Sequence, residues 1–147
     1  MKKQKTGHIK SEMIKQKWFT INAEGKVLGR LASNIAKQLI GKNSVEYMTS
    51  VDNKDFIIVY NVEKIVVTGK KQTQKKYYNH SRYPGGLKET TYKDLLAKNP
   101  EQVILHAVKG MLPKNKLGRN MLTKLKVVKG EIHKYSAQNA EVIEFTY

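Results

Sequence analysis

Apolar residues in the first half of the chain follow a strand, helix, strand order. Residues 18–21 form a short aromatic and β-branched run that ends in a polar, glycine-containing turn, which is typical of a strand. From Leu28 to Leu39 the apolar positions recur at helical spacing, which predicts an amphipathic helix ended by Gly41. Residues 56–60 are apolar without interruption, as in a strand covered on both faces of a parallel sheet. The pattern therefore predicts a βαβ unit and the α/β fold class.

The second half of the chain is predicted to be mainly helical. Residues 65–68 are β-branched and predict one further strand before it. A capping-box pattern at 91–94 and an Asn-Pro pair at 99–100 predict the starts of two helices. Leucines and a methionine over 117–125 predict another helix, which is expected to run into a short strand at 127–128.

Length and composition favour a single folded domain with a basic extension. The chain has 147 residues, which is close to one domain of ordinary size. Residues 1–17 carry six lysines and one glutamate with almost no apolar periodicity, so they are predicted to form a basic N-terminal arm. Residues 18–147 are predicted to fold as one α/β domain. No apolar run reaches the roughly 18 residues that cross a bilayer, and no targeting peptide is recognised, so a cytoplasmic location is expected.

The net charge indicates the class of partner. Lys and Arg number 28 against 12 Asp and Glu, which gives a formal charge of +16, far beyond what solubility requires. A large polyanion is therefore the expected partner. The chain has no cysteine, which excludes disulfides, thiolate zinc sites and cysteine nucleophiles.

The cations are segregated along the chain. Residues 64–88 contain six lysines and Arg82, residues 102–130 contain six lysines and Arg119, and neither window contains an acid. Because a solvated surface usually mixes both signs, this segregation favours a surface that binds phosphates. Residues 75–83 also interleave aromatic rings and a histidine with cations, a mixture that can stack on unpaired bases. The alternative is a hairpin whose tyrosines pack in the core.

Arginine is rare among the basic residues and occurs only as Arg30, Arg82 and Arg119. Its planar fork makes bidentate phosphate contacts and stacks in a way that lysine cannot reproduce, so these three positions are candidates for phosphate contacts. Residues 28–30 and 117–119 both read Leu-Gly-Arg near a predicted helix start, where free N–H groups and the helix dipole favour an anion. Chance, with glycine as a helix-entry residue, explains the spacing equally well.

No residue is predicted to be catalytic. The chain lacks a dinucleotide-binding glycine fingerprint and a phosphate loop. Its four histidines have no metal-ligand spacing and belong to no recognisable catalytic triad. Asp52 and Asp55 could form a carboxylate pair, but they are more simply explained as turn residues. The sequence therefore predicts no enzyme activity, metal, cofactor or small-molecule substrate.

Four short motifs resemble those of a known family. In chain order they are LGRLA at 28–32, VTGKK at 67–71, HSRYPGGLK at 80–88 and AVKGMLP at 107–113. Together they resemble the bacterial-type ribosomal protein L13 family of the large subunit, over about residues 17–138. The chain departs from the family pattern at Asn22, Val128 and Lys134.

The resemblance implies a fold, a function and a set of partners. The fold is a three-layer α/β/α arrangement around a small, mainly parallel central sheet. The implied function is structural: the protein would bind 23S-type RNA of the large ribosomal subunit, contact neighbouring ribosomal proteins and support assembly and translation in the cytoplasm. A protein that binds or modifies nucleic acid off the ribosome is the alternative. Attachment to anionic membranes is disfavoured because the cationic windows are not amphipathic helices.

The candidate RNA-binding residues combine the acid-free windows, the three arginines and the resemblance, which implies contacts in residues 77–88 and 109–119. Gly85 and Gly86 are expected to form a tight turn whose backbone can approach RNA closely. The complete predicted set is Arg30, Lys70, Lys71, Lys75, Lys76, Tyr78, His80, Arg82, Tyr83, Gly85, Gly86, Lys88, Lys109, Lys114, Lys116, Arg119 and Lys124.

Overall fold

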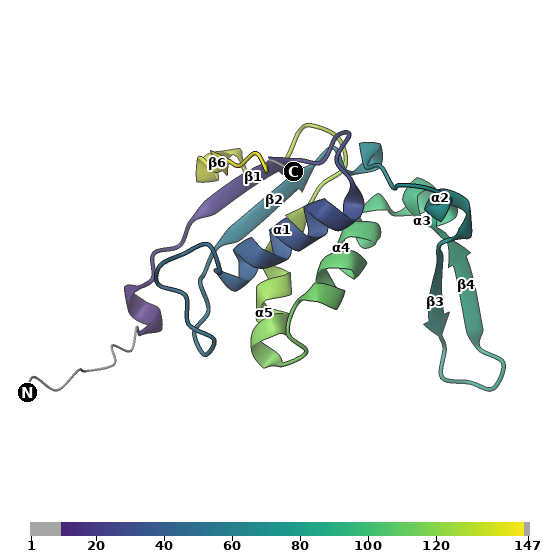
Figure 1. Ribbon diagram of the computed structural model, residues 1–147, viewed down its shortest axis with the longest axis horizontal. Coiled ribbons are helices and arrows are strands. Elements are labelled where there is room, and N and C mark those ends of the chain that lie inside the picture. The colour runs from purple at the N-terminus through teal and green to yellow at the C-terminus, as the bar shows by residue number, and fades with distance from the viewer. Residues whose placement is uncertain (1–9, 146–147) are drawn as a thin grey trace, which may run out of the picture.

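A four-stranded parallel sheet forms the centre of the protein (Figure 1). The structure is a computed structural model in which residues 10–145 are described. The strands lie in the order β5-β2-β1-β6, and every neighbouring pair is parallel. Their bounds are β1 Trp18–Asn22, β2 Phe56–Tyr60, β5 Leu125–Val127 and β6 Glu141–Val142.

Five α-helices and a separate hairpin complete the described elements, together with three short 3-10 helices. The α-helices are α1 Leu28–Ile40, α2 Lys71–Gln74, α3 Tyr92–Lys98, α4 Pro100–Met111 and α5 Lys116–Thr123. The hairpin pairs β3 Lys76–His80 with β4 Leu87–Thr91 in antiparallel register. The 3-10 helices are η1 Ser11–Met13, η2 Val62–Lys64 and η3 Ser136–Gln138.

The predicted βαβ unit is confirmed by β1, α1 and β2. The apolar positions of α1 are buried, and its polar positions Arg30 and Lys37 are exposed. The helix ends at Gly41, whose φ of 85° lies in the left-handed region that favours glycine. A side chain here would also collide with Asn53, because a Cβ would lie 2.7 Å from its Cγ. The predicted end of the helix at Gly41 therefore has both a conformational and a steric cause.

The two faces of the sheet are covered by different parts of the chain. Ile21, Ile57 and Val59 are fully buried in the hydrophobic core, to which α1 and α4 also contribute. The two helices pack against each other (Figure 1). Strand alternation places Trp18 on the opposite face, where its ring stacks on Tyr135 at 6.0 Å between centroids. The segment around η3 thus covers this second face. The predicted three-layer α/β architecture around a small parallel sheet is confirmed.

The predicted strand at residues 65–68 is wrong. Only Val66 forms a β-bridge there, with Val27. The backbone N–H of Leu28 donates to Val66 O at 2.9 Å, so this segment is bound to the turn that enters α1 and not to the sheet. Asn61, the residue before η2, has a φ of 57°, and η2 turns the chain away from the direction of β2 before Ile65 is reached.

Helix boundaries in the second half are close to the predicted ones. Thr91 caps α3 as predicted, because its side chain accepts a hydrogen bond from Asp94 N at 3.2 Å. Pro100 occupies the first turn of α4 as predicted. The helix predicted over 117–125 ends instead at Thr123, because Leu125 already belongs to β5 and is buried against the core.

The predicted N-terminal arm lies only partly within the described residues. The prediction for residues 1–9 falls outside them. Residues 10–17 include η1, and the following Ile14 is buried, with 6% of its surface exposed. This part of the chain therefore packs one apolar side chain on the domain.

Candidate nucleic-acid interface

The hairpin β3–β4 projects from the body of the protein (Figure 1). Its tyrosines differ in exposure: Tyr77 is half-buried, whereas Tyr78 is 61% and Tyr83 75% exposed. Tyr77 faces the body, and its ring lies 5.7 Å from the ring of His106. The sequence left open whether these tyrosines pack or face outward. In the structure Tyr77 packs, and the other two are available for stacking.

The hairpin tip is a tight turn, as predicted for Gly85 and Gly86. Gly86 N donates to Tyr83 O at 2.9 Å, and Ser81 N donates to Gly86 O at 3.0 Å. Gly85 has a φ of 70°. A Cβ on Gly86 would lie 2.8 Å from the carbonyl oxygen of Tyr83, so this position has no room for a side chain. The two glycines allow the backbone to fold closely on itself at the tip.

Arg82 stands in an uncommon backbone conformation at the same tip. Its φ is 68°, which is left-handed for a residue other than glycine. Its backbone N–H donates to Nδ1 of His80 at 2.9 Å, so the His80 ring anchors the turn that presents the guanidinium. Both side chains are exposed. The sequence did not reveal this contact.

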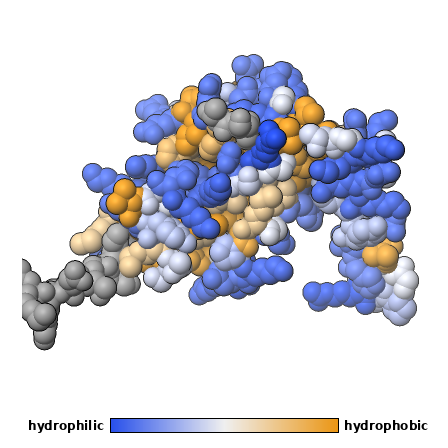
Figure 2. All heavy atoms as spheres, viewed as in Figure 1, coloured by the Kyte–Doolittle hydropathy of each residue, from blue (hydrophilic) through white to orange (hydrophobic). Residues whose placement is uncertain are grey.

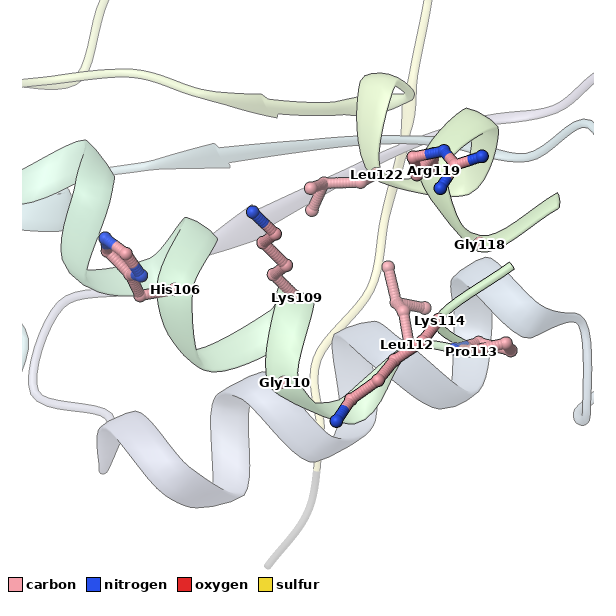
Figure 3. Close-up of a pocket in the computed structure, with 9 residues that line it drawn as sticks. All are labelled: His106, Lys109, Gly110, Leu112, Pro113, Lys114, Gly118, Arg119 and Leu122. Carbon is pink, nitrogen blue, oxygen red and sulfur yellow. The ribbon is translucent and has the colours of Figure 1, made fainter. Parts of the chain in front are cut away.

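The second acid-free window forms a cavity between α4 and α5 (Figure 3). The cavity has a volume of about 560 Å³. Lys109 and Lys114 come from α4 and the loop after it, and Arg119 comes from α5 on the other side. The remaining lining residues are His106, Gly110, Leu112, Pro113, Gly118 and Leu122.

The two Leu-Gly-Arg segments occupy the first turns of α1 and α5, but only the second requires glycine for steric reasons. A Cβ on Gly29 would meet nothing within 4 Å. A Cβ on Gly118 would collide with the backbone of Pro113, whose carbonyl carbon would lie 2.8 Å away. Asn115 Oδ1 also accepts a hydrogen bond from Gly118 N at 2.8 Å and caps α5. Close packing therefore explains why glycine occupies position 118. The shared Leu-Gly-Arg sequence does not by itself indicate that both segments bind an anion.

Tyr77 and His106 join the two cationic windows in space. Tyr77 belongs to β3 in the first window, and His106 lies on α4 in the second and lines the cavity. Lys75 Nζ lies 5.4 Å from the centre of the Tyr77 ring. The position of His106 was not predicted, although its spacing from Lys109 and Gly110 places all three on one side of α4.

The predicted RNA-binding residues differ in their exposure and in whether they pair with a carboxylate. All of them are exposed except Gly86 and Lys124. Lys124 forms an ion pair with Asp52, and its side chain is only 13% exposed. Lys76 pairs with Glu89 at 2.8 Å, and this hydrogen bond raises the pKa of Lys76. These two ammonium groups therefore already have a carboxylate partner.

The other predicted residues lie on the hairpin, α2, α4, α5 and the start of α1. Lys70 and Lys71 stand at the start of α2. Arg30 lies in the first turn of α1, where Leu28 N donates a hydrogen bond to the carbonyl oxygen of Val66, which comes shortly before Lys70 in the sequence. Lys88 lies on β4, and Lys116 begins α5. Hydrophilic residues cover most of the hairpin, at the right of Figure 2.

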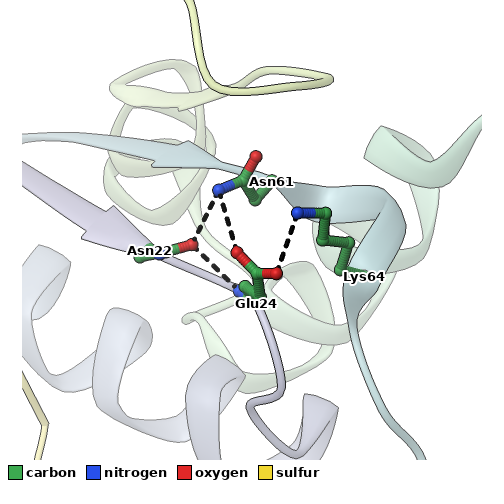
Figure 4. A network of polar contacts seen from close by, with 4 residues as sticks. All are labelled: Asn22, Glu24, Asn61 and Lys64. Carbon is green, nitrogen blue, oxygen red and sulfur yellow. Dashed lines mark hydrogen bonds and ion pairs between the residues drawn. The ribbon is translucent and has the colours of Figure 1, made fainter.

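A polar network holds the carboxyl ends of β1 and β2 together (Figure 4). Asn61 Nδ2 donates to Asn22 Oδ1 at 3.1 Å, and Glu24 N donates to the same oxygen at 3.0 Å. Glu24 also pairs with Lys64 at 2.8 Å, and this hydrogen bond raises the pKa of Lys64. Lys64, the first residue of the first acid-free window, therefore pairs with a carboxylate outside that window.

Asp52 and Asp55 differ in their surroundings. Asp55 is 5% exposed, and its Oδ2 accepts hydrogen bonds from Gln38 Nε2 at 3.1 Å and Asn53 Nδ2 at 2.6 Å. Burial raises the pKa of Asp55 to about 6, against the lowering effect of the Gln38 hydrogen bond. Asp52 is engaged with Lys124. Both carboxylates therefore have structural partners, and Asp55 is more than an exposed turn residue.

Residues 10–145 provide neither a cluster of metal-binding side chains nor a membrane-spanning helix. No group of three or more His, Asp or Glu side chains lies close enough together there to hold a metal ion. No helix in this part of the chain is both long enough and apolar enough to cross a membrane.

Comparison with known proteins identifies the family. The model of the family described as Ribosomal protein L13 matches residues 16–134. A protein of Nitratidesulfovibrio vulgaris is 57% identical over 136 residues, which cover 92% of this chain and 94% of the relative. A protein of Aquifex aeolicus is 58% identical over 140 residues, covering 95% and 97%. Both relatives are named large ribosomal subunit protein uL13. The chain therefore belongs to the ribosomal protein L13 family.

Proposed function

We propose that this protein is a structural constituent of the large ribosomal subunit in the cytoplasm, and that it supports subunit assembly and translation by binding the subunit's RNA. The names of its relatives support the assignment to the large subunit. The specific RNA would be of the 23S type, and neighbouring large-subunit proteins would complete its surroundings. No reaction is assigned to the protein.

One observation carries the proposal of RNA binding through this surface: the two acid-free windows meet at the Tyr77–His106 contact. At this contact the base of the hairpin adjoins the α4–α5 cavity, so the two sets of cations are neighbours in the fold. Lysines here would neutralise phosphates and release counterions, which supplies affinity without sequence preference. Arg82 and Arg119 would fix the register by bidentate phosphate contacts.

The exposed aromatic rings supply a different kind of contact. Tyr78 and Tyr83 are both more than half exposed on a projecting hairpin, where they can stack on unpaired bases. An isolated two-stranded hairpin is only marginally stable in water. Here Tyr92 N donates to Lys75 O at 2.8 Å and ties the hairpin base to α3. The hairpin is thus held at its base and open along its length.

The test is binding to protein-free large-subunit RNA across a range of salt concentrations. We expect the affinity to fall steeply with salt, by about 0.7 to 0.9 in the logarithmic slope for each phosphate neutralised. Arg82→Lys should weaken site-specific binding more than Lys75→Arg does, because only the first change removes a planar fork. An affinity that does not depend on salt would contradict the proposal.

Location is tested separately by sucrose-gradient fractionation followed by mass spectrometry. The protein is expected to travel with the large subunit through a moderate salt wash. A mainly free pool would favour a nucleic-acid-binding role off the ribosome instead.

A further inference from the structure

We propose that the cavity between α4 and α5 receives a single unpaired base of the bound RNA, with the flanking phosphates held by the cations at its rim. This inference rests on the proposed function and deepens it. It assigns to the cavity the recognition of one extruded nucleotide, and it leaves the hairpin to hold the surrounding backbone.

The volume and lining of the cavity can accommodate the face of a base. Its volume of about 560 Å³ lies within the roughly 300–1,000 Å³ typical of small-ligand pockets. Leu112 is buried and Leu122 half-buried, and with Pro113 they provide an apolar surface. A phosphate group alone would gain nothing from such a surface. The face of a base would gain from leaving water there.

The rim of the same cavity is cationic. Lys109, Lys114 and Arg119 are all exposed, and none of the nine lining residues is acidic. Lys109 and Arg119 belong to different helices, so the positive charges stand on two sides of the apolar surface (Figure 3). A nucleotide has the complementary arrangement, because its base is flanked by two phosphates along the strand.

His106 provides a ring at one end of the cavity. Tyr77 contacts this ring at 5.7 Å with an interplanar angle of 43°, so the imidazole is supported from the hairpin side. The side chain remains exposed. An aromatic ring held in place loses little freedom when a base stacks on it.

Gly110 supplies an independent observation. It lies in the last turn of α4 on the wall of the cavity, and a Cβ there would meet nothing within 4 Å. Packing therefore does not require glycine, and glycine is less favourable than alanine inside a helix. A side chain at Gly110 would occupy the space that we assign to the base.

The first experiment compares Gly110→Leu with Gly110→Ala in binding to protein-free large-subunit RNA. Both changes should leave the helix folded, because both replace glycine with a better helix former. We expect Gly110→Leu to lower the affinity at least tenfold and Gly110→Ala less than threefold. The salt slope should be the same for both variants and the wild type, because no cation is removed. A Gly110→Leu affinity within threefold of Gly110→Ala overturns the proposal.

The second experiment separates base from backbone. Amide spectra of the full-length ¹⁵N-labelled protein are recorded with adenosine-, guanosine-, cytidine- or uridine-centred trinucleotides, and with a trinucleotide that lacks the central base. At least one intact trinucleotide should shift the amides of Gly110 and Gly118 more than the abasic one does. Equal shifts, or none at these residues, overturn the proposal. Wild-type RNA binding that depends on salt would then still support the proposed function, whereas its loss would remove both.

Discussion

The buried carboxylate of Asp55 makes stability depend on pH in a direction opposite to that of most acidic residues. Burial raises its pKa from 3.8 to about 6, so the folded state favours the protonated form. Its contribution to stability is therefore fully present below pH 3.8 and is lost as the pH rises through about 6. At neutral pH the folded protein must keep an ionised carboxylate in a site that disfavours it.

The magnitude follows from the same two values. The difference between 3.8 and about 6 corresponds to about 3 kcal/mol, at 1.36 kcal/mol per pH unit. Asp55 and Lys17 both line an open cavity of about 590 Å³, and solvent access through this cavity should screen part of the effect. We therefore expect about 2 kcal/mol. For a chain of this length that corresponds to roughly 4–8 °C in the melting temperature.

The perturbation is Asp55→Asn, which removes the charge and keeps a similar shape. The variant should melt at about the same temperature as the wild type near pH 4 and about 4–8 °C higher at pH 8. Differential scanning calorimetry at several pH values measures this. The control Asp52→Asn removes the partner of Lys124 and should lower the melting temperature at pH 8. A difference between Asp55→Asn and wild type that stays constant with pH would refute the reasoning.

Two further predictions concern packing. Gly118→Ala should destabilise the protein by about 1–3 kcal/mol, because its Cβ would collide with the backbone of Pro113. The control Gly29→Ala, in the other Leu-Gly-Arg segment, should be neutral or slightly stabilising. Thermal melting of both variants checks this, and equal changes in melting temperature would disprove it. Tyr135→Ala should loosen the segment over the second face of the sheet and lower the free energy of unfolding by about 1–2 kcal/mol. Its fluorescence emission, which comes from Trp18, should shift to longer wavelength. The control Tyr83→Ala, on the exposed hairpin tip, should leave that emission unchanged.

Elements that repeat a pattern over many residues could be predicted from the sequence. The helix α1 shows this, because its spacing and its terminal Gly41 act locally and agree with the tertiary packing. The strand β6 had no such signal, since its two residues are defined only by pairing with β1. Residues 65–68 have strand-like composition, but the turn begun by Asn61 takes them away from the sheet.

The candidate interface was also only partly predictable from the sequence. Charge along the chain predicted which segments would be cationic, and Tyr77 of the first segment contacts His106 of the second. Pairing in space could not be predicted: Lys124 has Asp52 as a partner 72 residues away, and Tyr77 meets His106 across two elements. The cavity beside Gly110 depends on how α4 and α5 pack, which composition does not specify.

The strand order also constrains how the protein can fold while it is being made. β1 is a central strand whose two neighbours are β2 and β6, and β6 lies at Glu141–Val142. During synthesis β1 and β2 can pair early, but one side of β1 stays without its neighbour until residues 141–142 have emerged. The nascent chain therefore keeps the edge of β1 at Phe19 and Thr20 unpaired until Val142 has been added, and such an unpaired edge favours aggregation before the sheet closes.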